Sequence, residues 1–98
     1  MKDYEKFQIE QRKLGILKAL SNAPAYTLND VAFKQVLASH GMRVGTDRLW
    51  ADVQWLHELS LVYMQTDADF FTATLTRTGV DVQNGLSTVH GVARPEPV

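Results

Sequence analysis

The stretch Gly45–Thr76, GTDRLWADVQWLHELSLVYMQTDADFFTATLT, changes its hydrophobic period partway along. In its first half, Leu49, Val53 and Leu56 recur at helical spacing and share one face of a helix. In its second half, apolar and polar side chains alternate on both sides of Thr66–Asp69, as they do in half-buried strands. The stretch therefore predicts a helix that leads directly into a β-hairpin.

The expected hairpin has strands over residues 61–66 and 70–76, joined by a tip at Thr66–Asp69. Two aspartates at a loop tip favour a tight turn through local hydrogen bonds, and we prefer this interpretation to a metal site. After the hairpin, Thr76 is expected to cap a last helix, Arg77–Asn84, that Gly85 closes. Gly79 is unusual within that helix.

Two more helices are expected upstream. The first covers Tyr4–Leu20, and its second half is apolar nearly all round. Asn29 is expected to cap a second helix over residues 30–39, which Gly41 ends. Ala32, Phe33, Val36 and Leu37 form its inner face, whereas Asp30, Lys34 and Gln35 are expected outside. This order predicts an α+β fold, a winged helix-turn-helix with a three-helix core, a β-hairpin wing and a C-terminal helix.

The division of the chain follows from the same elements. Residues 1–86 are expected to form the winged-helix domain, and residues 87–98 an extended tail with two prolines. The apolar surface of the first helix has two explanations. It packs within the domain, or it forms the interface of a homodimer.

Composition excludes several classes of protein. The 98 residues contain no cysteine, which removes disulfides, thiolate zinc sites and cysteine nucleophiles. His40, His57 and His90 lie far apart, and no spacing matches a metal site or a nucleophile–base pair. His57 next to Glu58 is most simply a solvated pair. The absence of a signal sequence and of a long apolar run favours a cytoplasmic protein without membrane contact. The lack of a nucleophile–base spacing and of a glycine-rich phosphate loop predicts that the protein is not an enzyme and needs no cofactor.

The third helix is the expected DNA-binding element. A helix in the major groove presents the face opposite its core side, and mainly its first turns. Gln54 suits adenine there, and Arg48 suits guanine or a phosphate. A solvated helix face is the alternative. The predicted DNA-binding residues are Thr46, Arg48, Trp50, Gln54, Arg43 and Lys34.

The charge pattern weakens this interpretation. The net charge is −1, and the basic excess lies in residues 1–20 and not in the helix-turn-helix. Asp67 and Asp69 place negative charge on the wing, where DNA-binding wings usually carry lysine or arginine. At least one of Trp50 and Trp55 is expected to pack against the first helix or the wing.

The segments DRLWADVQWLHELSLV and TATLTRTGVDVQNG, together with YTLND and HGVARP, resemble small winged-helix proteins of Mu-like prophages. More broadly, the chain is similar to ArsR- and DeoR-type winged-helix repressors. The resemblance implies a winged-helix fold and DNA binding in a phage or prophage setting. In DeoR-type repressors two arginines typically follow the apolar anchor of the recognition helix. Here Trp50 and Ala51 follow Leu49, which argues against direct base reading by arginine at those positions.

Two functions remain open. The first is sequence-dependent binding of double-stranded DNA by a homodimer, as a phage-type transcriptional regulator or DNA-handling accessory. The second is a winged helix with little DNA affinity that contacts a phage protein in packaging or replication.

Overall fold

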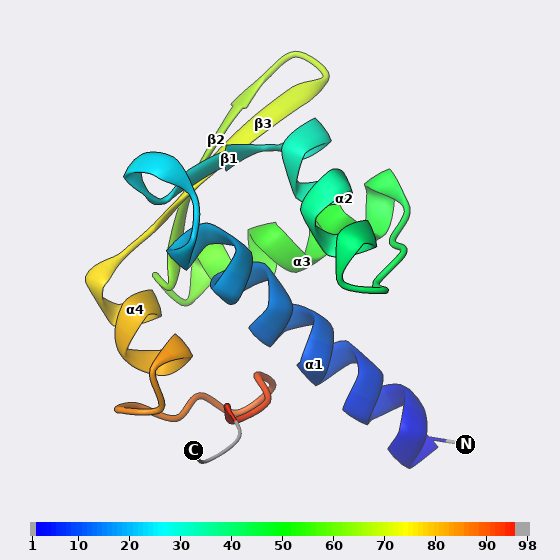
Figure 1. Cartoon of the computed structure of the whole chain (residues 1–98), viewed down its shortest axis with the longest axis vertical. Coiled ribbons are helices and arrows are strands. Elements are labelled where there is room, and N and C mark those ends of the chain that lie inside the picture. Colours follow the sequence, from blue (N-terminus) through cyan, green and yellow to red (C-terminus); the bar gives the residue numbers. More distant parts are fainter. Residues whose placement is uncertain (1, 96–98) are drawn as a thin grey trace.

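The computed structural model describes residues 2–95 and has helices on one side of a small antiparallel sheet (Figure 1). In chain order the elements are α1 (Lys2–Ser21), the short 3-10 helix η1 (Pro24–Tyr26), β1 (Thr27–Asn29), α2 (Asp30–Ser39), α3 (Thr46–Glu58), β2 (Val62–Asp67), β3 (Phe70–Leu75) and α4 (Arg77–Gln83). This is the predicted order of elements, and the short β1 pairs with β3 of the hairpin.

Local signals fix both ends of α2 where the sequence predicts them. The Asn29 side-chain oxygen accepts the backbone N–H of Ala32 at 2.8 Å and caps the first turn. At the other end Gly41 has a φ of +80°, and Met42 N–H donates to the carbonyl of Leu37 at 2.8 Å. This left-handed ending turns the chain towards α3.

The predicted phase of α3 is confirmed, because Leu49, Val53 and Leu56 are fully buried. They meet the buried second half of α1 and the inner faces of α2 and the sheet. The largest fully buried side chains are Phe33, Phe71, Ile16, Leu17, Leu20, Leu37, Leu49, Leu56, Leu61, Val53 and Val62. One core therefore unites α1, α2 and α3 with the hairpin.

Replacing Leu56 with alanine is expected to lower the free energy of unfolding by about 2–5 kcal/mol, because a fully buried leucine leaves a cavity. Chemical denaturation of the two proteins measures the change. Leu59→Ala, at a half-exposed leucine just after the same helix, should cost less than about 1 kcal/mol. A neutral Leu56→Ala variant would contradict the packing described here.

The sheet has the order β1-β3-β2, with β3 in the centre. The β2–β3 pairing runs from Val62 opposite Leu75 to Asp67 opposite Phe70. The hairpin loop therefore contains only Ala68 and Asp69, so the expected four-residue tip is too long. Ala68 has a φ of +54°, a conformation typical of two-residue loops whose twist matches that of the strands.

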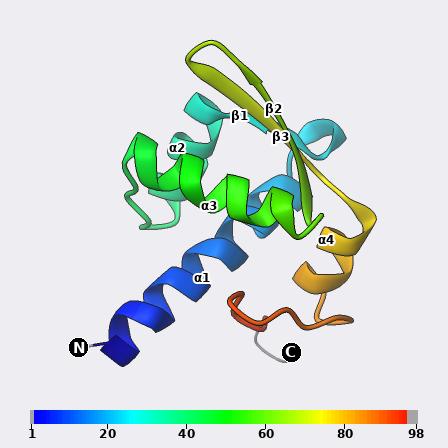
Figure 2. The same cartoon turned by 180° about the vertical axis from the view of Figure 1, so that it is seen from behind.

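α1 divides into two halves. Leu14, Ile16 and Leu20 are buried in the core, as expected. The first half projects away from the rest of the molecule in both views (Figures 1 and 2), and Tyr4 and Phe7 are 59% and 56% exposed. Packing within the domain therefore explains only the second half of the apolar surface.

The segment after α4 has no helix or strand as far as Pro95, but it folds back onto the domain. Val92 is buried, and Ala93 N–H donates to the carbonyl of Glu10 in α1 at 3.1 Å. Gly91 lies against the Trp55 ring, where an added Cβ would be 2.9 Å from it. The last part of the expected tail, residues 96–98, lies outside the described residues.

Candidate nucleic-acid interface

The outer face of α3 is open to solvent. Figure 2 shows this helix lying across the front of the molecule, with α1 crossing behind it. Asp47, Ala51, Gln54 and Glu58, on the side opposite the core, are all exposed. The structure thus leaves free the helix face that the sequence predicts for DNA.

The first turn of α3 gathers most of the predicted site. Thr46 and Arg48 are exposed there, and Arg43 is exposed in the preceding turn. From α2, the Lys34 ammonium donates to the Thr46 hydroxyl. Lys34 is thus held at the end of α3 at which a helix dipole attracts phosphate, and Arg48 lies in the same turn. Arg43 instead lines a cleft with Tyr4 and Phe7 of α1.

One flank of α3 faces α1, and its ion pair was not predicted. Asp52 is only 4% exposed, and the Arg12 Nε donates to its carboxylate. Among the described residues this is the only ion pair, and the Arg12 Nη2 is buried without a hydrogen-bond partner. The sequence carried a signal for this burial, since Asp52 lies three residues after Leu49 and four before Leu56.

A second cation lies on the same flank. Lys13 is buried, and its ammonium is 3.7 Å from the centre of the Trp55 ring. Burial lowers the pKa of Lys13, while the neighbouring charge of Asp52 acts in the opposite direction. Arg12 and Arg48 lower this pKa further through repulsion. Arg48 is therefore close enough to this cluster for its charge to act on it.

The other flank of α3 holds Trp50 against the hairpin. Its ring lies edge-on to Phe71 with centroids 5.2 Å apart, and Phe71 also packs on Phe33 at 5.9 Å. Trp50 is half-buried in this position. The expectation that a tryptophan packs against α1 or the wing is confirmed for both, since Trp55 contacts Lys13 of α1.

The hairpin contributes negative charge. Residues 61–76 contain no lysine or arginine, and Asp67 and Asp69 are both exposed at its end. His57 is exposed beside Glu58, as expected, and its Nδ1 also accepts the Met64 N–H at 3.2 Å. It thereby covers part of the free edge of β2.

Asp30 was expected on the outside of α2, and this is wrong. The side chain is only 9% exposed, and it lines a groove together with residues of the hairpin. Its Oδ1 accepts the Val31 N–H at 2.9 Å.

Other kinds of site are not evident in the described part of the chain. Among residues 2–95, no three histidine, aspartate or glutamate side chains gather as metal ligands would. None of the described helices is both long enough and apolar enough to cross a bilayer.

A helix-turn-helix formed by α2 and α3, followed by the β2–β3 hairpin, defines a winged-helix protein. Two solved structures, the complex structures of hsRosR-S4 and hsRosR-S1, share this fold with TM-scores of 0.62 and 0.65. They are 23% and 21% identical to this chain and match 74% and 82% of it. The chain spans 63% of the length of the first and 70% of the second.

The sequence comparison gives the family. No model of a known protein family matches the chain. It is 34% identical over 88 residues to the "uncharacterized protein gp26" of Escherichia phage Mu, covering 90% of this chain and 91% of that protein. The chain belongs to the family of this phage Mu protein, which supports the expected relationship to Mu-like prophages.

Proposed function

We propose that this protein binds double-stranded DNA through α3, as a phage-type transcriptional regulator or DNA-handling accessory. The observation that carries the proposal is the uncovered first turn of α3, which exposes Thr46 and Arg48 and lies next to Lys34 of α2. Neutralising phosphates with such side chains supplies most of the affinity of duplex binding.

The predicted contacts divide into base reading and backbone binding. Gln54, on the free face of α3, suits adenine in the major groove, and Arg48 suits guanine or a phosphate. Thr46, Arg43 and Lys34 suit phosphates. For Trp50, the contact with Phe71 favours a role in holding α3 against the hairpin.

The opposing charges predict modest affinity for a single copy. Asp47 and Glu58 lie on the same free face and repel phosphates. A homodimer would double the number of cations that meet the duplex and would set the half-site spacing. The exposed Tyr4 and Phe7 on the projecting half of α1 favour that half as the dimer contact.

Fluorescence polarisation with phage and host duplexes at low salt tests the proposal. We expect binding at micromolar protein, with log K falling linearly as log salt rises. Micromolar protein without salt-dependent binding would count against it.

Arg48→Ala is expected to weaken duplex binding by about 1–3 kcal/mol with little change in stability, since the side chain is exposed. Arg77→Ala removes an equally exposed arginine at the start of α4 and is the matched control. Polarisation titrations of both variants against the same duplex give the difference. Equal losses in the two variants would show that only total charge matters.

A second candidate function is protein contact, and the acidic hairpin favours it. A surface with Asp67 and Asp69 and no cation repels DNA but suits a basic protein. Purification of the protein from cells in which the phage has been induced, followed by identification of what co-purifies, separates the two functions. A stoichiometric protein partner without nucleic acid supports this candidate, and co-purifying duplex DNA supports the first.

A further inference from the structure

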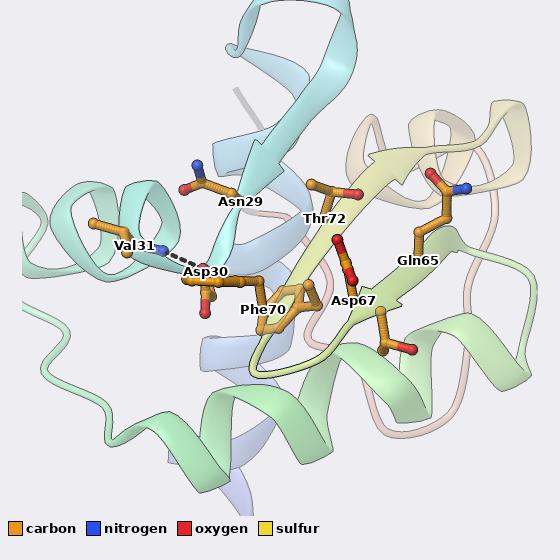
Figure 3. A pocket seen from close by; sticks show the side chains of 9 residues that line it. Asn29, Asp30, Val31, Gln65, Asp67, Phe70 and Thr72 are labelled. Atoms are coloured by element: carbon orange, nitrogen blue, oxygen red, sulfur yellow. Dashed lines mark hydrogen bonds between the residues drawn. The ribbon is translucent and has the colours of Figure 1, made fainter.

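A groove separates the start of α2 from the hairpin (Figure 3). Its volume is about 480 Å³. Asp67 and Phe70 are opposite one another on β2 and β3 and project from the outer face of the sheet, away from the core side chains Phe71 and Val62. Asp30 closes the groove from α2. We call this feature the α2–hairpin groove.

The residues that line the groove carry negative charge and include no cation. Two of its nine lining residues, Asp30 and Asp67, are acidic, and none is basic. Asp30 is more than nine-tenths buried, yet it forms no ion pair with a lysine or arginine of the described chain. Its one hydrogen bond there is the Val31 N–H on Oδ1. A desolvated carboxylate gains most from a cation that enters its site.

The same groove has an apolar wall. The Phe70 side chain is 61% exposed although it is large and aromatic, and it lines the same groove as Asp30. The face of an aromatic ring attracts a guanidinium group more often than an ammonium group. Gln65 and Asn29 add amide groups at the rim.

We infer that the α2–hairpin groove receives an arginine side chain from a protein partner. The guanidinium group pairs with Asp30 and Asp67 and lies on the Phe70 ring, an arrangement that suits its planar, five-donor shape better than a lysine. DNA does not fit the groove, because phosphates would meet two carboxylates. This inference rests on the protein-contact candidate and is independent of DNA binding by α3.

A peptide titration followed by NMR amide shifts of the full chain tests the inference. The probe is the peptide Gly-Arg-Leu-Arg-Gly, and its control contains citrulline, a neutral isostere of arginine. We expect the arginine peptide to shift the amides of Val31, Phe70 and Thr72, and citrulline to weaken binding about tenfold. No shifts at these amides with either peptide, or equal shifts with both, would overturn it.

Asp67→Asn is expected to weaken the binding of the arginine peptide about tenfold, since it removes one carboxylate of the groove. Asp69→Asn removes the same charge from the hairpin tip, outside the lining residues, and should change the affinity less than about twofold. Thermal melts check that both variants fold. Equal losses in the two variants would overturn the inference, because general charge attraction would then explain the binding.

Two further titrations address other occupants. If groove shifts grow with protein concentration alone, a second copy occupies it and the inference is wrong. The inference is also wrong if a duplex displaces the peptide. Absence of DNA binding together with arginine-specific groove shifts would overturn the DNA proposal and support this one.

Discussion

Gly79→Ala is expected to lower the free energy of unfolding by at least about 3 kcal/mol, because the added methyl group has no space. A Cβ at this position would lie 2.1 Å from the Leu61 carbonyl oxygen and 2.6 Å from a methyl carbon of Leu75. The Leu61 oxygen cannot easily move, since it accepts both the backbone N–H and the hydroxyl of Thr76. The same hydroxyl caps α4 by accepting the Gly79 N–H at 3.0 Å.

Helix propensity acts in the opposite direction and is too small to compensate. Alanine favours a helix over glycine by about 1 kcal/mol, so a tolerated substitution would stabilise α4. The expected net loss lowers the melting temperature by about 15 °C in a domain of this size. Calorimetry or thermal circular dichroism measures the loss.

Gly45→Ala is the matched control, because no atom lies within 4 Å of its added Cβ. It should change stability by less than about 1 kcal/mol, as expected for an exposed position just before a helix. A Gly79→Ala variant as stable as this control would show that α4 does not approach Leu61 as closely as described.

Asp52→Ala is expected to lower the free energy of unfolding by about 3 kcal/mol, because it leaves the Arg12 guanidinium without its carboxylate partner. This loss is at the lower end of what breaking a buried ion pair costs in stability, since the Arg12 side chain is 18% exposed and can turn towards water. The pKa of Lys13, which burial lowers, should fall further once the opposing charge of Asp52 is gone. Urea denaturation measures the stability, and NMR titration of the Lys13 ammonium measures the pKa.

Two variants separate pairing from loss of charge. Asp47→Ala removes an exposed carboxylate from the same helix and should change stability by less than about 0.5 kcal/mol. The double variant Arg12→Met, Asp52→Leu should recover most of the loss, because it removes both charges and fills the space with apolar side chains. If Asp52→Ala and Asp47→Ala were equally stable, the ion pair would make no net contribution.

The two proposed surfaces divide the winged helix by charge. Arg48 and the Lys34 ammonium lie at the start of α3, while Asp30 and Asp67 line the α2–hairpin groove. DNA and a basic protein segment would therefore bind at different places. A hairpin without cations is suited to the second role.

The sequence alone determined the order of the elements and most of their ends. The period of Leu49, Val53 and Leu56 gave the phase of α3, since a buried face needs apolar residues every three or four positions. Asn29 and Thr76 gave the helix starts, because their side chains cap the neighbouring backbone N–H groups. The sequence also indicated the exposed first turn of α3, which follows from the phase.

Only the tertiary structure decided what meets these faces. The burial of Asp30 at the start of α2 and the pairing of Asp52 with Arg12, 40 residues away, depend on contacts between distant segments. The same holds for Gly79, which is unfavourable in a helix by its own propensity. The Leu61 carbonyl lies so close to it that no side chain fits at this position. Periodicity and capping are local in the chain and can be read from it. The partner of a buried charge, or the atom that excludes a methyl group, is fixed only when the helices and the sheet pack together.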